Sequence, residues 1–188
     1  ETSGKPAAWS EPPSWSHQPK FPWVESLLVD LSEKFPTPIT VMDVGCFTGY
    51  FLRNLIEHYP GKFRGIGVDI QFELMEKLNH MARVSHQPIV FEKRLPKVSV
   101  EAITCFDTLE HVSNDQLLLQ RMAKRVKSGG KMFIHLPQDD QYAEANDEHL
   151  RVYRKEDFIH WLQDWKQTVE QGKDEEGRPT WLVTLEKP

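Results

Sequence analysis

Short runs of β-forming residues alternate with segments of helical periodicity through the middle of this 188-residue chain. Parallel strands need a long crossover between them, usually a helix, so this alternation predicts an α/β fold with a mostly parallel sheet and helices on both faces. The expected strands cover residues 39–44, 63–68, 89–91, 100–106 and 131–136, and the expected helices cover residues 49–59, 72–81 and 116–126.

Two further segments precede this alternation. The first 22 residues hold five of the thirteen prolines, and proline is excluded from helix interiors and central strands, so residues 1–22 are expected to form a Pro/Trp-rich N-terminal arm. Apolar residues recur at helical spacing over residues 23–35, which predicts a first helix. Residues 23–188 are expected to form one domain.

The chain closes with a helical pattern and a hairpin pattern. Apolar residues at helical spacing predict a helix over residues 158–165. Two strand-like segments, 166–171 and 181–186, flank a turn-rich stretch and predict a C-terminal antiparallel hairpin. The hairpin brings the expected sheet to seven strands, in a Rossmann-like arrangement.

Composition excludes several classes of protein. No run of apolar residues exceeds three, so we expect neither a membrane span nor a signal peptide, and the expected compartment is the cytoplasm. A net charge of -5 without a Lys/Arg-rich block makes nucleic acid an unlikely partner, although it does not exclude a local basic patch. Cys46 and Cys105 are expected to be reduced structural thiols. The oligomeric state is not predicted.

The ends of the first two predicted strands carry the residues that most suggest a ligand. In an open parallel sheet, ligands bind beyond the carboxyl ends of the strands. The first strand runs into Asp43-Val44-Gly45-Cys46-Phe47-Thr48-Gly49, where glycine lets the backbone turn tightly. The second ends at Asp69, which can accept hydrogen bonds from ribose hydroxyls. Phe47 breaks the G-x-G-x-x-G spacing of dinucleotide sites, so the pattern favours a nucleoside without a pyrophosphate.

The stretch from Asp43 to Pro137 resembles the class I S-adenosylmethionine-dependent methyltransferases. The resemblance rests on four motifs in order: Asp43-x-Gly45-x-x-x-Gly49, Asp69, Phe106-Asp107-x-Leu109-Glu110-His111-Val112 and Val126-Lys127-Ser128-Gly129-Gly130. It implies S-adenosyl-L-methionine as the cofactor and S-adenosyl-L-homocysteine as the product. The cofactor-binding residues that it implies are Asp43, Gly45, Cys46, Phe47, Gly49, Asp69, Ile70, Glu92 and Phe106. Phe47 replaces a frequent family glycine, and Glu92 stands for the acid usual after the third strand.

Methyl transfer from a sulfonium is an in-line displacement, so alignment and exclusion of water supply much of the catalysis. A hydroxyl acceptor also needs a base with a pKa near neutrality, which suits histidine. The candidate catalytic residues are His111, His135 and His149. The acid-rich stretch 137–153 repels phosphate, so we expect a small-molecule acceptor with oxygen as the acceptor atom. Tyr142, Arg151 and Tyr153 are expected to face it.

Two alternatives stay open. Asp107, Glu110, His111 and His149 offer oxygen and nitrogen ligands, a pattern that resembles the metal-dependent methyltransferases of small-RNA 3′ ends. The alternative function is therefore metal-dependent RNA 2′-O-methylation, with those four residues as metal ligands. The first expectation is that the chain binds no metal. Ubiquinone O-methyltransferases carry a similar acid-x-x-Glu-His segment. The other alternative is a cofactor-binding module without chemistry of its own.

Overall fold

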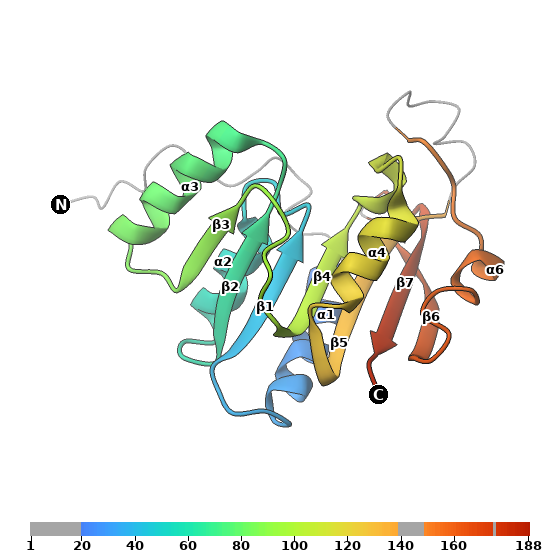
Figure 1. The fold of residues 1–188 in the computed structure, drawn as a ribbon, viewed down its shortest axis with the longest axis horizontal. Coiled ribbons are helices and arrows are strands. Elements are labelled where there is room, and N and C mark those ends of the chain that lie inside the picture. Colours follow the sequence, from blue (N-terminus) through green and yellow to red (C-terminus); the bar gives the residue numbers. More distant parts are fainter. Residues whose placement is uncertain (1–19, 139–148, 175) are drawn as a thin grey trace.

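Seven strands form a single sheet in the order β3-β2-β1-β4-β5-β7-β6 (Figure 1). The computed structural model describes residues 20–138, 149–174 and 176–188. β1 to β4 are joined in parallel, β5 is parallel to β4, and β7 runs antiparallel to both β5 and β6. The strands are β1 (Ile39–Val44), β2 (Phe63–Val68), β3 (Ile89–Glu92), β4 (Val100–Phe106), β5 (Val126–Pro137), β6 (Lys166–Lys173) and β7 (Pro179–Glu186). The predicted fold class, including the hairpin, is confirmed.

Helices cover both faces of the sheet, each over its own apolar core. On one face, Leu28, Leu52 and Leu78 of three successive helices pack against strand residues such as Val41. On the other face, Met42 joins a second core with residues of α4 and α6. The helices are α1 (Lys20–Ser32), α2 (Tyr50–His58), α3 (Phe72–Val84), α4 (Asp115–Ala123) and α6 (Lys155–Phe158), with a 3-10 turn at Leu109–His111. Neighbouring β1 residues therefore face opposite cores, as in strands buried on both sides.

The connection between β3 and β4, residues 93–99, contains no helix. It runs along the face of the sheet that also carries α4 (Figure 1). Residues of both segments line one cavity. This face is therefore less completely covered than the face that carries α1, α2 and α3. This matters for function because the ligands of an open parallel sheet bind beyond the carboxyl ends of its strands.

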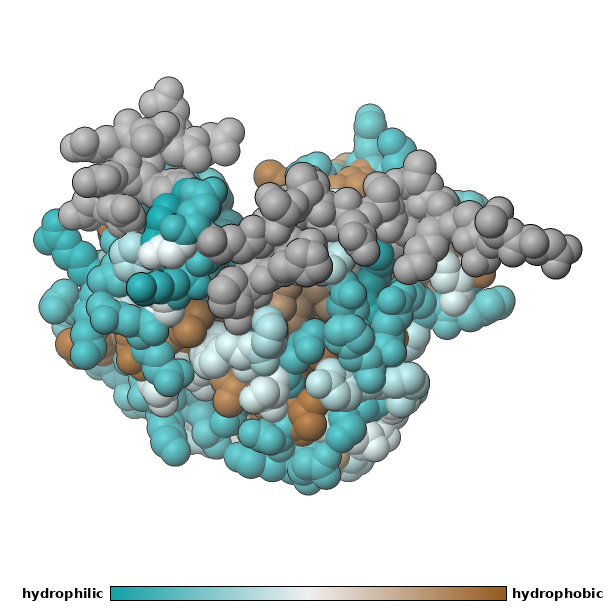
Figure 2. Space-filling model, turned by 180° about the vertical axis from the view of Figure 1, so that it is seen from behind, coloured by the Kyte–Doolittle hydropathy of each residue, from teal (hydrophilic) through white to brown (hydrophobic). Residues whose placement is uncertain are grey.

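Seen from behind, the described surface is mainly hydrophilic, with apolar residues interspersed among polar ones (Figure 2). Helices at the surface of a globular protein show this pattern when their apolar side faces the core. A search of the described residues finds no helix that is both long and apolar enough to cross a membrane.

Several predicted element boundaries differ from the structure, and three helices show the differences that matter here. The first helix begins at Lys20 rather than residue 23, because Pro22 lies in the first turn, where its missing N–H is not needed. The rest of the predicted arm lies outside the described residues. The helix predicted over 116–126 ends at Ala123. Residues 126–130 instead form the first part of β5, where its pairing with β4 shifts register. The helix predicted over 158–165 is the short α6, followed by turns.

Candidate functional site

The turn between β1 and α2 accepts only glycine at two positions. Gly45 has φ 80° and Gly49 has φ 66°, both in the left-handed region. A Cβ on Gly45 would lie 2.0 Å from Oγ1 of Thr108, and a Cβ on Gly49 would lie 2.4 Å from the Phe91 ring. The backbone therefore turns directly against the end of β4, and we call this segment, residues 45–49, the glycine turn.

Asp69 lies against the glycine turn. Its Oδ2 accepts a hydrogen bond of 2.9 Å from the backbone N–H of Phe47, and its Oδ1 accepts one of 3.0 Å from Gln71. The N–H of Gly45 donates to the carbonyl of Val68 at 2.8 Å, which joins the two strand ends directly. Each carboxylate oxygen can accept further hydrogen bonds, as ribose hydroxyls would require. The structure thus brings together the two segments that the sequence predicted to be adjacent.

Phe47 occupies a backbone conformation that favours glycine. Its φ is 44°, and a non-glycine residue in this region costs about 1 kcal/mol or more. In this conformation the Phe47 N–H donates to Asp69. The conformation explains why a glycine could stand here, and it leaves the aromatic ring 39% exposed at the ligand side.

A cavity of about 1290 Å³ opens beside the glycine turn. Four of the nine predicted cofactor-binding residues line it, namely Gly45, Phe47, Asp69 and Ile70. They come from the ends of β1 and β2, as the topology of a parallel sheet requires. The size and position of the cavity suit a nucleoside with room beyond it.

The other five predicted cofactor-binding residues do not line the cavity but support the residues that do. Gly49 starts α2, and buried Asp43 accepts a hydrogen bond of 2.7 Å from Thr104. The backbone carbonyl of Glu92 accepts from Asp69, while the Glu92 side chain is exposed. The remaining two pack against neighbours, Cys46 on Met75 and Phe106 on the rings of Phe21 and Phe51. These residues hold the strand ends in place without lining the cavity.

Sequence reasoning missed most of the remaining lining. Five of these residues are cationic, and they come from the β3–β4 connection and from α4 with the residues after it. The cationic lining residues are Lys93, Arg94, Lys97, Arg121 and Arg125. Leu118 and Arg121 lie one helical turn apart, so the sequence held part of this signal. Nothing in the sequence alone placed the β3–β4 connection opposite them.

Asp107 lies at the boundary between this cavity and a second one of about 150 Å³. Its Oδ1 contacts Nδ1 of His135 at 2.5 Å, and its Oδ2 accepts from Nζ of Lys20. Burial raises the pKa of the Asp107 carboxyl, but the interactions with His135 and Lys20 outweigh burial and hold this pKa well below its usual range. Asp107 is therefore a carboxylate, and it anchors the buried His135 at the end of β5.

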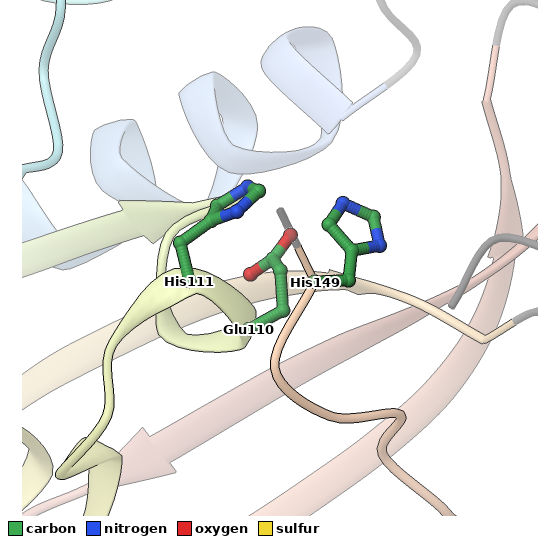
Figure 3. Close-up of side chains that lie close together, drawn as sticks. All are labelled: Glu110, His111 and His149. Carbon is green, nitrogen blue, oxygen red and sulfur yellow. The ribbon is translucent and has the colours of Figure 1, made fainter. Parts of the chain in front are cut away.

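His111 also lines both cavities. The side chains of Glu110, His111 and His149 point toward one another across the second cavity (Figure 3). One ligand atom of each lies within 4.8 Å of those of the other two. His149 comes from the segment after β5, whose Leu150 N–H donates to the carbonyl of Glu110 at 2.8 Å. The structure thus brings together three of the four residues of the alternative metal set.

Glu110 has one carboxyl oxygen without a partner. The residue is 1% exposed, and its Oε2 has no hydrogen-bond partner among the residues that the structure describes. Burial and, to a smaller extent, the charge of Asp107 raise the pKa of Glu110 to about 8. A buried polar atom in this state calls for a ligand, a proton or a cation. Asp107, the fourth residue of the set, is engaged by Lys20 and His135.

The prediction that Arg151 and Tyr153 face the acceptor is wrong. The Tyr153 hydroxyl donates to Asp115 at 2.7 Å, and its ring is buried against Phe158 and Trp161. Arg151 forms an ion pair of 2.5 Å with the same Asp115. Both side chains therefore fasten the segment after β5 to the start of α4. Tyr142 lies outside the described residues.

The two cysteines are buried, as predicted. Cys46 follows β1 and Cys105 belongs to β4, which are neighbouring strands. Burial raises the pKa of both thiols, and nearby carboxylates raise it further. Neither cysteine offers a thiolate for nucleophilic or redox chemistry.

Comparison with known proteins places this geometry in context. The profile of a protein family described as "Methyltransferase domain" matches residues 15–177. A tRNA U34 carboxymethyltransferase from Campylobacter jejuni is 26% identical over 148 residues, which are 75% of this chain and 47% of that protein. The chain therefore spans about half the length of the curated relatives that it matches.

Solved structures share the fold at low sequence identity. The YcgJ protein of Bacillus subtilis has a TM-score of 0.69 at 13% identity, covering 89% of this chain and 97% of its own. The N-methyltransferase NodS of Bradyrhizobium japonicum, solved with S-adenosyl-L-homocysteine, has a TM-score of 0.62 at 16% identity, covering 90% and 88%. At these identities the likeness is one of fold.

Proposed function

The chain belongs to the methyltransferase-domain family, among the class I S-adenosylmethionine-dependent members, and from this premise we propose that it transfers the methyl group of that cofactor to an oxygen atom. The observation that carries the proposal is that two cavities meet at Asp107 and His111. The larger one contains the glycine turn and Asp69, which suit the nucleoside. The smaller one is lined by histidines and carboxylates, which suit a hydroxyl.

The larger cavity supplies the cofactor contacts. Asp69 would accept hydrogen bonds from the ribose hydroxyls, and the glycine turn would lie against the methionine part, where no Cβ intervenes. Ile70 and Phe47 would cover the nucleoside with apolar surface. The cofactor supplies an electrophilic methyl group, and the residues of this chain supply its alignment.

The residues at the junction would handle the acceptor proton. A hydroxyl that attacks a methyl group loses its proton, and His111 is the ring that lines both cavities. His135 is held by Asp107 at the same boundary, so its ring is oriented before a substrate arrives. His149 faces His111 with a ring-centre separation of 4.8 Å. We assign His111 the base role and the other two histidines supporting positions.

The acceptor belongs to one of two classes. A small molecule is favoured by the size of the second cavity, about 150 Å³, which fits one polar group more readily than a large ring system. An RNA acceptor is favoured by the relatives that are named tRNA U34 carboxymethyltransferase, and its ribose would supply the hydroxyl. In both classes the reacting atom is an oxygen.

A divalent cation could also bind at this site and take part in the reaction. The unpartnered oxygen of Glu110, with the rings of His111 and His149, forms a donor set that suits such an ion. These three residues would hold it, and it would orient the acceptor oxygen and lower the pKa of that oxygen. Its test is binding of Mn²⁺ to the chain, with Glu110→Gln as the variant that loses it and Glu156→Gln as the exposed control.

The proposed reaction is tested by incubating the chain with methyl-labelled cofactor and either total RNA or extracted metabolites. Label recovered in a 2′-O-methylnucleoside or in an O-methylated small molecule supports the proposal. Label recovered only on nitrogen or carbon contradicts it. Cofactor binding without turnover of either pool would instead favour the cofactor-binding module.

A further inference from the structure

We propose that the cationic half of the larger cavity is a track for the phosphate backbone of a single-stranded RNA acceptor. We call this half the cationic trough, and it is formed by Lys93, Arg94, Lys97, Arg121 and Arg125. The inference rests on the proposed function, because it names the class of acceptor that the methyl group would reach.

The trough has two cationic sides. One is the β3–β4 connection, which supplies three of the five side chains, and the other is α4 with the residue two positions beyond its C-terminal end. Four of the five residues are exposed and Arg125 is half-buried, so their charges face the open cavity. The two sides lie on the same face of the sheet (Figure 1). The trough therefore shares one cavity with the glycine turn and extends from it along the β3–β4 connection.

These cations are not used inside the fold. In the described ranges, no carboxylate lies within ion-pair distance of Arg94, Lys97, Arg121 or Arg125. Lys93 lies over the Phe72 ring, at 4.2 Å from its centre. Cations gathered in one concave site repel one another unless an anion is brought to them. The clustering is notable in a chain whose net charge is -5.

The acidic residues of the cavity are already engaged. Asp69 accepts two backbone hydrogen bonds at the glycine turn, and Asp107 is paired with Lys20 and His135. The five cations therefore outnumber the two engaged carboxylates in the lining, and Lys93, which follows Glu92, lies beside Asp69. An anionic ligand would be attracted to the trough and guided toward the junction where Asp107 and His111 lie.

The dimensions and the floor favour a polynucleotide strand over a single phosphate. The cavity, about 1290 Å³, exceeds the roughly 300–1,000 Å³ of ordinary ligand pockets, so it has room for more than the cofactor. Apolar Leu95, Val112 and Leu118 line it between the cations. Unstacked bases need such apolar contacts, whereas a duplex hides its base faces. A 2′-hydroxyl on the strand would supply the acceptor oxygen.

The test measures binding of a fluorescein-labelled 12-nucleotide single-stranded RNA to the full chain by anisotropy, with S-adenosylhomocysteine present, across a salt series. We expect Arg94→Gln/Lys97→Gln and Arg121→Gln/Arg125→Gln each to weaken binding roughly tenfold and to reduce the salt slope by about 1.4, for two lost phosphate contacts. The matched control, Lys77→Gln/Arg83→Gln, removes two exposed cations from α3 on the other face. The control should bind RNA like the unmodified chain.

Three results would overturn the proposal. The first is absence of RNA binding by a chain that still binds S-adenosylhomocysteine, which leaves the proposed methyl transfer intact. The second is an equal loss of affinity in the α3 control, which would mean a nonspecific charge effect. The third is competition by adenosine monophosphate at the same concentration as the RNA, which would make the trough a mononucleotide site. Failure to bind S-adenosylhomocysteine would instead contradict the proposed function itself.

Discussion

Asp43 lies behind the glycine turn with 3% of its surface exposed, and its carboxylate accepts a hydrogen bond from Thr104. Burial is the main reason that its pKa rises from 3.8 to about 7, and the charge of Asp69 adds to the rise. The chain thus keeps an ionisable group where an amide would fit. Carboxyl groups with a strongly shifted pKa cluster at functional sites, and this one lies directly behind the glycine turn.

The pKa of Asp43 predicts a pH dependence of stability. Because the folded pKa lies above the unfolded one, the folded state binds the proton more tightly, and this stabilisation is lost as the pH rises from about 4 through 7. We expect Asp43→Asn to remove that dependence, by at most roughly 1.4 kcal/mol per pH unit. Urea unfolding of both proteins at pH 4.5 and 8 measures it. A variant that is less stable than the unmodified chain at pH 8 would contradict this account.

A substitution of His111 distinguishes a catalytic role of this residue from a structural one. We expect His111→Ala to lower kcat by about 10²–10⁴-fold, because a positioned base contributes that much. The affinity for S-adenosylhomocysteine, measured by calorimetry, should change little. The exposed His160 supplies the control variant, His160→Ala, with unchanged kcat. A normal kcat in the His111 variant would refute the base assignment.

At the scale of elements, the glycine turn depends on close packing as well as on backbone conformation. Gly45 and Gly61 both have positive φ, 80° and 76°, but only Gly45 has a neighbour where a Cβ would stand. Gly61→Ala should therefore cost about 1 kcal/mol of stability and leave cofactor affinity unchanged. Gly45→Ala should cost more stability and weaken cofactor binding, since Thr108 must move. Equal effects in denaturation and calorimetry would show that packing at Thr108 is unimportant.

Helix α1 reaches the site through one residue. The Lys20 side chain is 4% exposed, and its ammonium group pairs with Asp107. We expect Lys20→Met to destabilise the fold by roughly 1–3 kcal/mol, less than for a fully buried pair because Asp107 stays 40% exposed and keeps His135. Lys34→Met, at a side chain 56% exposed, should change stability by less than about 0.5 kcal/mol. Chemical denaturation compares the two, and equal losses would contradict the role given to Lys20.

The elements that sequence reasoning predicted well are those with local signals. Asn114 caps α4, its side chain accepting from the Leu117 N–H at 3.1 Å, and such a cap is a local signal for the start of a helix. The glycine turn and Asp69 were predicted together because both follow strands of a parallel sheet. The helix predicted over 158–165 does not form, because Leu162 has φ 41°, which a helix cannot contain. Phe158 and Trp161, which produced the apolar pattern, are nevertheless buried as core residues. Apolar periodicity alone does not register that break.

For the molecule as a whole, net charge was a poor guide to the charge inside the larger cavity. The sum of -5 hides five cations that line one cavity, because the β3–β4 connection and α4 are far apart in sequence and meet only in the fold. The junction was partly hidden for the same reason, since Lys20, Asp107 and His135 come from three elements. Tertiary placement therefore decides both the charge that lines the larger cavity and the environment of the histidines.

The central claim is that the glycine turn and Asp69 hold S-adenosylmethionine. Calorimetric titration of the full chain with S-adenosylhomocysteine tests it most directly, with Asp69→Ala as the variant and Asp164→Ala, at an exposed acid, as its control. We expect one molecule to bind per chain, and Asp69→Ala to weaken binding by roughly 1.5–3 kcal/mol through loss of charge-assisted hydrogen bonds. Absence of binding, or an affinity unchanged by Asp69→Ala, would contradict the claim.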